Sequence, residues 1–147
     1  MFRNYRFNVA LGLSTFVLGL IFGSMIQFAN VAEAQPSNRV FELRTYTTLP
    51  GRLDALHARF AQHTIGLFEQ HGMTNIGYFS PQDVPMAENT LIYILAHNSR
   101  EAAATSWDAF VADPERQRVF EESQRDGRIV EKLQSIFLDA TDYSQLK

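Results

Sequence analysis

Residues 39–48 read Arg-Val-Phe-Glu-Leu-Arg-Thr-Tyr-Thr-Thr, and this stretch decides the fold. Successive side chains of a β-strand point to opposite faces. One face then carries Phe41 and Leu43, and it is predicted to face the core. The other face carries Glu42, Arg44 and Tyr46. This mixture is too polar for a surface that packs against helices, so we expect it to face a partner or a pocket.

Composition and charge limit the class of protein. The chain has 147 residues, which suits one domain behind a leader. Removing residues 1–34 takes away Arg3, Arg6 and Glu33 and changes the formal net charge from −3 to −4. A protein that binds nucleic acid is expected to carry a basic stripe, so this charge argues against that function. The chain has no cysteine, which excludes disulfides, thiolate metal sites and cysteine nucleophiles.

The N-terminus is typical of an export signal. Arg3 and Arg6 precede an uncharged, mostly apolar segment that ends at Ala32, and small residues at 32 and 34 suit a signal peptidase. We expect residues 1–34 to be removed by cleavage after Ala34, leaving a short linker over 35–39. The alternative is an uncleaved membrane anchor, because the apolar segment approaches the length that spans a bilayer. In both cases the domain is expected outside the cytoplasm, in the periplasm or the extracellular space.

The rest of the chain alternates between strand and helix patterns. Strands are predicted at 40–48, 74–82, 90–98 and 129–138, and helices at 52–70, 100–112 and 115–124. Asn98 or Ser99 is expected to cap the helix at 100–112, and Asp113-Pro114 to begin the next one. The order β-α-β-β-α-β predicts an α+β, ferredoxin-like domain over 40–147, with an antiparallel sheet in the order 4-1-3-2 and two main helices on one face.

The second face of this sheet is left without helices. We expect Leu91, Tyr93 and Leu95 to lie on it. A bare mixed face of this kind is costly to leave in water, so a second copy of the chain is expected to cover it. The sequence therefore predicts a homodimer.

Several short motifs resemble one known family. They are Phe41-Glu-Leu-Arg-Thr-Tyr46, Pro50-Gly51, His71-Gly72, Asn89-Thr-Leu-Ile-Tyr93, Ser106-Trp-Asp-Ala-Phe110, Asp113-Pro114 and Asp142-Tyr143-Ser144. In this order and spacing they resemble the NIPSNAP family, over about Val40 to Lys147. The resemblance implies a dimeric α+β barrel. It brings no established catalytic residues, and an export leader is unlike the mitochondrial members.

The candidate pocket lies on the mixed face of the two central strands. Arg44 and Tyr46 come from the first strand and Tyr93 and His97 from the third, and the predicted order makes these strands neighbours. In a dimer they are expected to line the space between the two sheets. Arg44 would bind a carboxylate or phosphate, and His97 would transfer a proton. Alternatively, Arg44 pairs with Glu42 or a partner carboxylate, and the tyrosines only pack.

The remaining histidines and aromatic residues give weaker indications. His63, on the inner edge of the first helix, is a further pocket candidate, although a histidine in this position more often bonds locally. None of the four histidines forms a pair at i and i+4, so no metal site is predicted. Other branches of the superfamily bind haem through an axial histidine, and this stays a minor alternative to the absence of a cofactor. Trp107, Phe110 and Val111 are expected in the core.

Three functions remain open at this level. The first is a dimeric module that binds a small apolar or acidic molecule. The second, implied by the resemblance, is a cofactor-independent enzyme of the monooxygenase or isomerase kind. The third is a protein-interaction module without a ligand. No nucleotide-binding loop or Ser-His-Asp order occurs in the sequence.

Overall fold

The computed structural model describes residues 39–147. The predicted leader, its cleavage after Ala34 and the localisation that follows from it lie outside the described residues. Within residues 39–147, no helix is long and apolar enough to cross a membrane.

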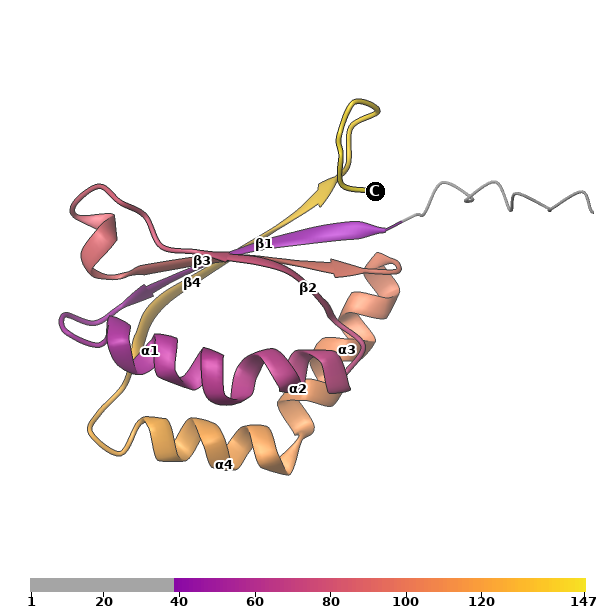
Figure 1. Cartoon of the computed structure of the whole chain (residues 1–147). Coiled ribbons are helices and arrows are strands. Elements are labelled where there is room, and N and C mark those ends of the chain that lie inside the picture. The colour runs from indigo at the N-terminus through magenta and orange to yellow at the C-terminus, as the bar shows by residue number, and fades with distance from the viewer. Residues whose placement is uncertain (1–38) are drawn as a thin grey trace, which may run out of the picture. The chain divides into compact units, whose positions relative to one another are not determined.

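Four antiparallel strands form one sheet (Figure 1). They are β1 Val40–Thr48, β2 Thr74–Phe79, β3 Thr90–His97 and β4 Val130–Asp139. Their order is β2-β3-β1-β4, and β1 pairs antiparallel with both β3 and β4. This confirms the predicted ferredoxin-like fold and the predicted order of the strands.

The helices follow the predicted bounds closely. They are α1 Leu53–Arg59, the π-helical segment η1 Phe60–Thr64, α2 Ile65–Gln70, α3 Arg100–Ala112, α4 Pro114–Ser123 and the 3₁₀ turn η2 Met86–Glu88. The first three are continuous and correspond to the single helix predicted over 52–70. Ser99 caps α3 by accepting a 3.1 Å hydrogen bond from the Ala102 amide, and Asp113 caps α4 by accepting one of 2.7 Å from Glu115.

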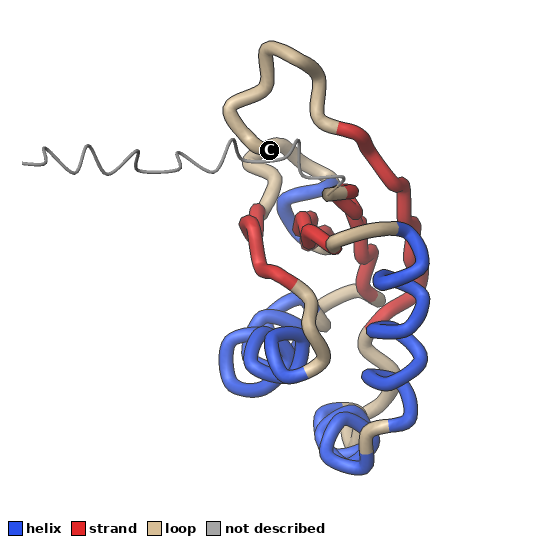
Figure 2. Tube along the Cα trace, turned by 90° about the vertical axis from the view of Figure 1, so that its right-hand side faces the viewer, coloured by secondary structure: helices blue, strands red, loops and turns tan. Residues whose placement is uncertain are grey.

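The main helices lie on one side of the sheet, and α4 runs alongside α1 (Figures 1 and 2). We call the sheet surface beneath them the covered face. It carries Glu42, Arg44 and Tyr46 of β1, Leu91, Tyr93, Leu95 and His97 of β3, and Leu133, Ser135 and Phe137 of β4. Tyr46, Leu91, Tyr93 and Leu95 form the core together with helix residues such as Phe60 and Phe68. The prediction that this mixed face points away from the helices is therefore wrong.

Several polar side chains on the covered face bond to one buried carboxylate, that of Glu42. Glu42 accepts four hydrogen bonds there, so burying it leaves no free charge. A buried polar group that is fully hydrogen-bonded costs little, and the larger side chains of this face provide the contacts that the helices need. This explains why the more polar of the two faces is the one that the helices cover.

The opposite surface, which we call the open face, is the smoother and more apolar one. It carries Phe41 and Leu43 of β1, Ile92, Ile94 and Ala96 of β3, Phe79 of β2, and Ile136 and Leu138 of β4. Phe79, Ile136 and Leu138 are 53%, 57% and 41% exposed. The C-terminal tail lies at one end of this face (Figure 1). Leu146 of the tail and Phe41 of β1 line a cavity of about 260 Å³ there.

Candidate functional site

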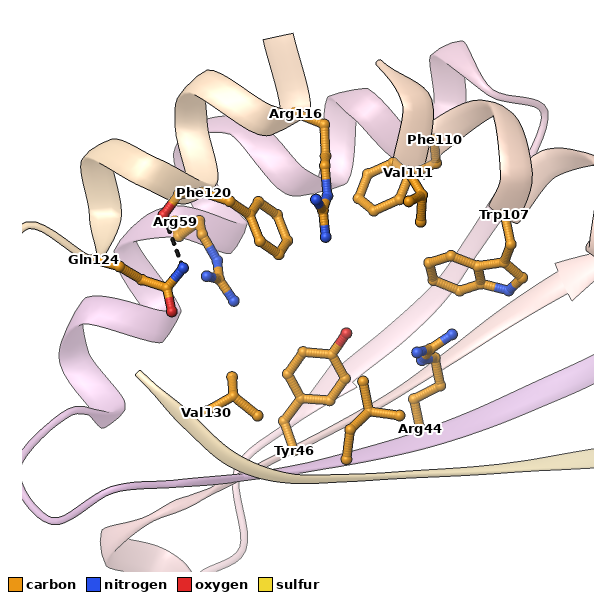
Figure 3. A pocket seen from close by; sticks show the side chains of 11 residues that line it. Arg44, Tyr46, Arg59, Trp107, Phe110, Val111, Arg116, Phe120, Gln124 and Val130 are labelled. Carbon is orange, nitrogen blue, oxygen red and sulfur yellow. Dashed lines mark hydrogen bonds between the residues drawn. The ribbon is translucent and has the colours of Figure 1, made fainter. Parts of the chain in front are cut away.

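A cavity of about 210 Å³ lies between the covered face and the helices (Figure 3). Its lining residues come from five elements: Arg44 and Tyr46 from β1, Arg59 from α1, Trp107, Phe110 and Val111 from α3, Arg116 and Phe120 from α4, and Val130 and Leu133 from β4, with Gln124 just beyond α4. The walls are mainly aromatic and aliphatic. Three guanidinium groups and the hydroxyl of Tyr46 reach into the space between them (Figure 3). A mostly apolar pocket with a few convergent polar groups is the usual form of a small-molecule site.

A buried carboxylate fixes one wall of this cavity. Glu42 is 2% exposed. Its Oε1 accepts from Arg44 Nη1 at 3.0 Å and from Ser135 Oγ at 2.6 Å, and its Oε2 accepts from His97 Nε2 at 3.1 Å and Trp107 Nε1 at 2.7 Å. The guanidinium of Arg44 also lies 3.9 Å from the centroid of the Trp107 ring. Strand β1, edge strand β4 and helix α3 are thus held together around one negative charge.

These contacts determine the protonation state of Glu42. Burial is the largest single influence and raises its pKa. The hydrogen bonds from His97, Ser135 and Trp107, together with the charge of Arg44, outweigh burial and lower the pKa of Glu42 to about 2. The carboxylate is therefore ionised at neutral pH and acts only as an acceptor, so each of its four partners must donate to it.

Two further arginines reach the cavity from the helices. The guanidinium carbon of Arg59 lies 4.0 Å from the centroid of the Phe120 ring, and that of Arg116 lies 3.9 Å from it. Figure 3 shows the ring between the two groups. Arg59 is only 4% exposed, and its one side-chain hydrogen bond among the described residues is a long contact of 3.5 Å to Ser123 Oγ.

The sequence-predicted residues divide into three groups. Arg44 and Tyr46 line the cavity, but on the helix side of the sheet and not in the space between two sheets, because the helices cover this face. Tyr93 and His97 share the face and are 0% and 2% exposed, in the core and beside Glu42. His63 lies in η1, outside the lining, and is half-buried. A ligand role for any of these residues stays a prediction.

Sequence reasoning missed several of the lining residues. Neither Arg59 nor Arg116 was among the predicted pocket residues. Trp107 and Val111 were expected in the core, and Trp107 does pack against the core while also lining the cavity. Val111 is in fact 52% exposed at the edge of the cavity, whereas Phe110 is buried as predicted. One signal pointed to Arg59: it stands between Leu56 and Phe60 on the apolar stripe of the first helix, where a solvated arginine is out of place.

The cavity does not suit a haem group. Its lining within residues 39–147 contains no histidine to serve as an axial ligand, and Nε2 of the nearby His97 donates to Glu42. The described residues also contain no group of three or more side chains that could hold a metal ion. The predicted absence of metal and cofactor stays a prediction.

Comparisons with known proteins agree on the fold. The NIPSNAP family model matches residues 41–145. A NIPSNAP family protein of unknown function from Agrobacterium tumefaciens is 22% identical, with a TM-score of 0.65, over 76% of this chain and 96% of that one. An uncharacterized NIPSNAP-like domain protein from Burkholderia xenovorans is 19% identical, with a TM-score of 0.64, over 74% of this chain and 90% of that one. No curated protein matches the sequence. At these identities the solved structures establish the fold alone.

Proposed function

The chain belongs to the NIPSNAP family, and on that basis we propose that it is a homodimeric protein that binds a small molecule in the cavity between its sheet and its helices. One observation carries the binding function. The space between β1, α3 and α4 is not filled by side chains, and about 210 Å³ remains beside Tyr46 and Trp107. The cavity opens to solvent, and concave, mostly apolar sites with a few convergent polar groups are where proteins bind small molecules.

The composition of the lining favours binding over acid–base catalysis. Within the described residues it contains arginine, tyrosine and glutamine as polar types, with no histidine, carboxylate, serine or cysteine. Those four types supply most general bases and nucleophiles in enzymes. The nearest carboxylate, Glu42, already accepts four hydrogen bonds. A cofactor-independent enzyme is therefore the less favoured alternative.

The open face supports the homodimer. Phe79 of β2 and Ile136 of β4 lie on this face, and the side chain of each is more than half exposed. Contiguous apolar surface of this kind marks interaction sites in soluble proteins. A second copy of the chain presents the same surface, so a two-fold axis would cover both at once. The cavity lies on the other side of the sheet, and each protomer would carry its own.

The binding function is tested by what the protein retains on purification. The wild-type protein is purified from its own host and denatured, and the small molecules that it releases are identified by mass spectrometry. The variants Val111→Phe and Val84→Phe are treated in the same way. Val111 is at the cavity, where the larger ring would fill space, whereas Val84 is 72% exposed in the β2–β3 loop and serves as the matched control. We expect one small molecule in the wild type and in Val84→Phe, and its loss from Val111→Phe. Equal amounts in all three proteins would contradict the proposed site.

A further inference from the structure

Two arginines at the cavity have no counter-ion among the residues that the structure describes. Among residues 39–147, neither Arg59 nor Arg116 forms an ion pair, and the cavity lining contains no aspartate or glutamate. The Nε atoms of both residues are buried and have no hydrogen-bond partner in the described part of the chain. Burial, and to a lesser degree the positive charge of Arg116, lower the pKa of Arg59 from its ordinary value.

The nearby carboxylate does not compensate these charges. Glu42 bonds Arg44, and its remaining acceptor positions are taken by His97, Trp107 and Ser135. What Arg59 and Arg116 do contact is the ring of Phe120. Stacking on an aromatic ring holds a guanidinium in place but does not neutralise it. Arg59 is thus a buried cation, and Arg116 a half-buried one, without an ion-pair partner among the described residues. Burying an unpaired charge is costly, which favours a bound anion as the missing partner.

The hydroxyl of Tyr46 reaches into the same space as the two guanidiniums (Figure 3). We propose that Arg59 and Arg116, with Tyr46, bind an oxyanion group of the ligand, and that the ligand is a small acid with an apolar body. The planar forks of two arginines match the oxygens of a carboxylate, and the phenol donates a further hydrogen bond. This inference rests on the proposed function and specifies the chemistry of its ligand.

The apolar part of the lining determines the other half of the ligand. Phe110, Val111 and Leu133 present carbon surfaces, and Val111 and Leu133 are half exposed where the cavity opens to solvent. A volume of about 210 Å³ accommodates one ring or a short branched chain, not an extended polymer. A bare inorganic anion would leave these walls in contact with water and gain nothing from them.

The chain contains a single tryptophan, and because it lines the cavity its fluorescence reports occupancy directly. The probes are two matched pairs, benzoate with benzamide and cyclohexanecarboxylate with cyclohexanecarboxamide, together with inorganic phosphate. Each is titrated into the full protein while the emission of Trp107 is recorded. We expect both acids to bind about tenfold or more tightly than their amides, because bonds to a charged group are worth about 1.5–3 kcal/mol. Phosphate is expected to bind more weakly than either acid.

Variants test whether the two arginines cause the preference for acids over amides. Arg59→Met and Arg116→Met are each expected to lower the affinity for the acids about tenfold and to leave the affinity for the amides unchanged. The control is Arg118→Met, because Arg118 lies on α4 with Arg116 but pairs with Glu115 and Glu122 outside the cavity. Without ligand, Arg59→Met should melt at the same temperature as the wild type or higher, because an uncompensated buried cation is removed.

The outcomes separate this inference from the proposed function. Amides that bind as tightly as acids, phosphate that binds as tightly as benzoate, or arginine variants that keep the preference for acids would each overturn the oxyanion site while leaving a binding cavity. A markedly lower melting temperature for both ligand-free arginine variants, with the acid preference intact, would show that these arginines serve only the fold. If no acid, amide or phosphate alters Trp107 emission, the oxyanion site fails, whereas the proposed function fails only if no small molecule copurifies with the wild type.

Discussion

Trp107 donates a hydrogen bond of 2.7 Å from its indole Nε1 to Oε2 of Glu42, although the two residues lie 65 positions apart in the sequence. The bond joins α3 to the central strand β1. It also turns the indole ring so that Arg44 stacks against it and the ring forms a wall of the cavity. The shape of the candidate site thus depends on one buried carboxylate, and several predictions concern that dependence.

Stability should fall in acid through Glu42. Its pKa is about 2 in the folded protein against an ordinary 4.5, so the stabilisation it contributes is complete above about pH 4.5 and is lost as the pH falls toward 2. A shift of this size corresponds to roughly 3 kcal/mol. Denaturant unfolding at a series of pH values between about 4.5 and 2 should show that the free energy of unfolding falls more steeply for the wild type than for Glu42→Gln. Parallel curves for the two proteins would show that Glu42 is not the responsible group.

At neutral pH, Glu42→Gln should itself be destabilising. The amide cannot balance the charge of Arg44, which would remain buried beside it. Breaking a buried ion pair from one side typically costs about 3–5 kcal/mol. The matched control is Glu121→Gln, because Glu121 is exposed on α4 and should tolerate the change. Equal free energies of unfolding for the two variants would contradict the central position of Glu42.

Arg44→Met tests the ion pair of Glu42 and Arg44 from the arginine side. Glu42 would keep His97, Trp107 and Ser135 as donors, so the loss should be smaller than for Glu42→Gln, at about 2 kcal/mol. The emission of Trp107 should also change, because the guanidinium 3.9 Å from its ring is removed. Arg118→Met, which removes two exposed ion pairs, should leave both stability and emission unaltered. An unchanged or higher stability of Arg44→Met would mean that Arg44 is dispensable for the fold.

Sequence patterns were sufficient for the fold because its determinants are local. Ser99, Asp113 and Pro114 mark helix boundaries by their own chemistry, and strict alternation in residues 40–48 sorts side chains onto two faces. Alternation does not say which face the helices cover. Which face the helices cover depends on whether Glu42 finds hydrogen-bond donors on elements far away in the sequence. A local pattern of residues contains no information about such donors. Arg116 and Phe120 reach the cavity for the same non-local reason.

The proposed homodimer predicts a specific response to a charge on the open face. Ile136 is 57% exposed there, and stable interfaces bury on the order of 1,200–2,000 Å² in total. Residues 35–147 should sediment with twice the monomer mass, and Ile136→Glu should sediment as a monomer because a buried charge without a partner is unfavourable. Ala109→Glu, on the exposed side of α3, should stay dimeric. A wild type that is monomeric at micromolar concentration would exclude the dimer.

Export remains a prediction from the sequence alone. We expect protein recovered from outside the cytoplasm to begin at Gln35, because small residues at 32 and 34 follow an apolar core flanked by Arg3 and Arg6. N-terminal sequencing gives the answer directly. Ala34→Leu should block processing, whereas Gln35→Leu should not. An intact N-terminus in the membrane fraction of the wild type would favour the uncleaved anchor.

Binding in the cavity is tested most directly by nuclear magnetic resonance of the ¹⁵N-labelled protein. Its one tryptophan gives a single indole N–H resonance, from the group that bonds Glu42 at the cavity wall. When a library of small acids and amides is added, we predict that the fragments that bind shift the Trp107 resonance and the amides of Tyr46 and Phe120, and that Val111→Phe abolishes these shifts. Shifts confined to the open face, around Phe41 and Ile94, with Trp107 unmoved, would contradict the account.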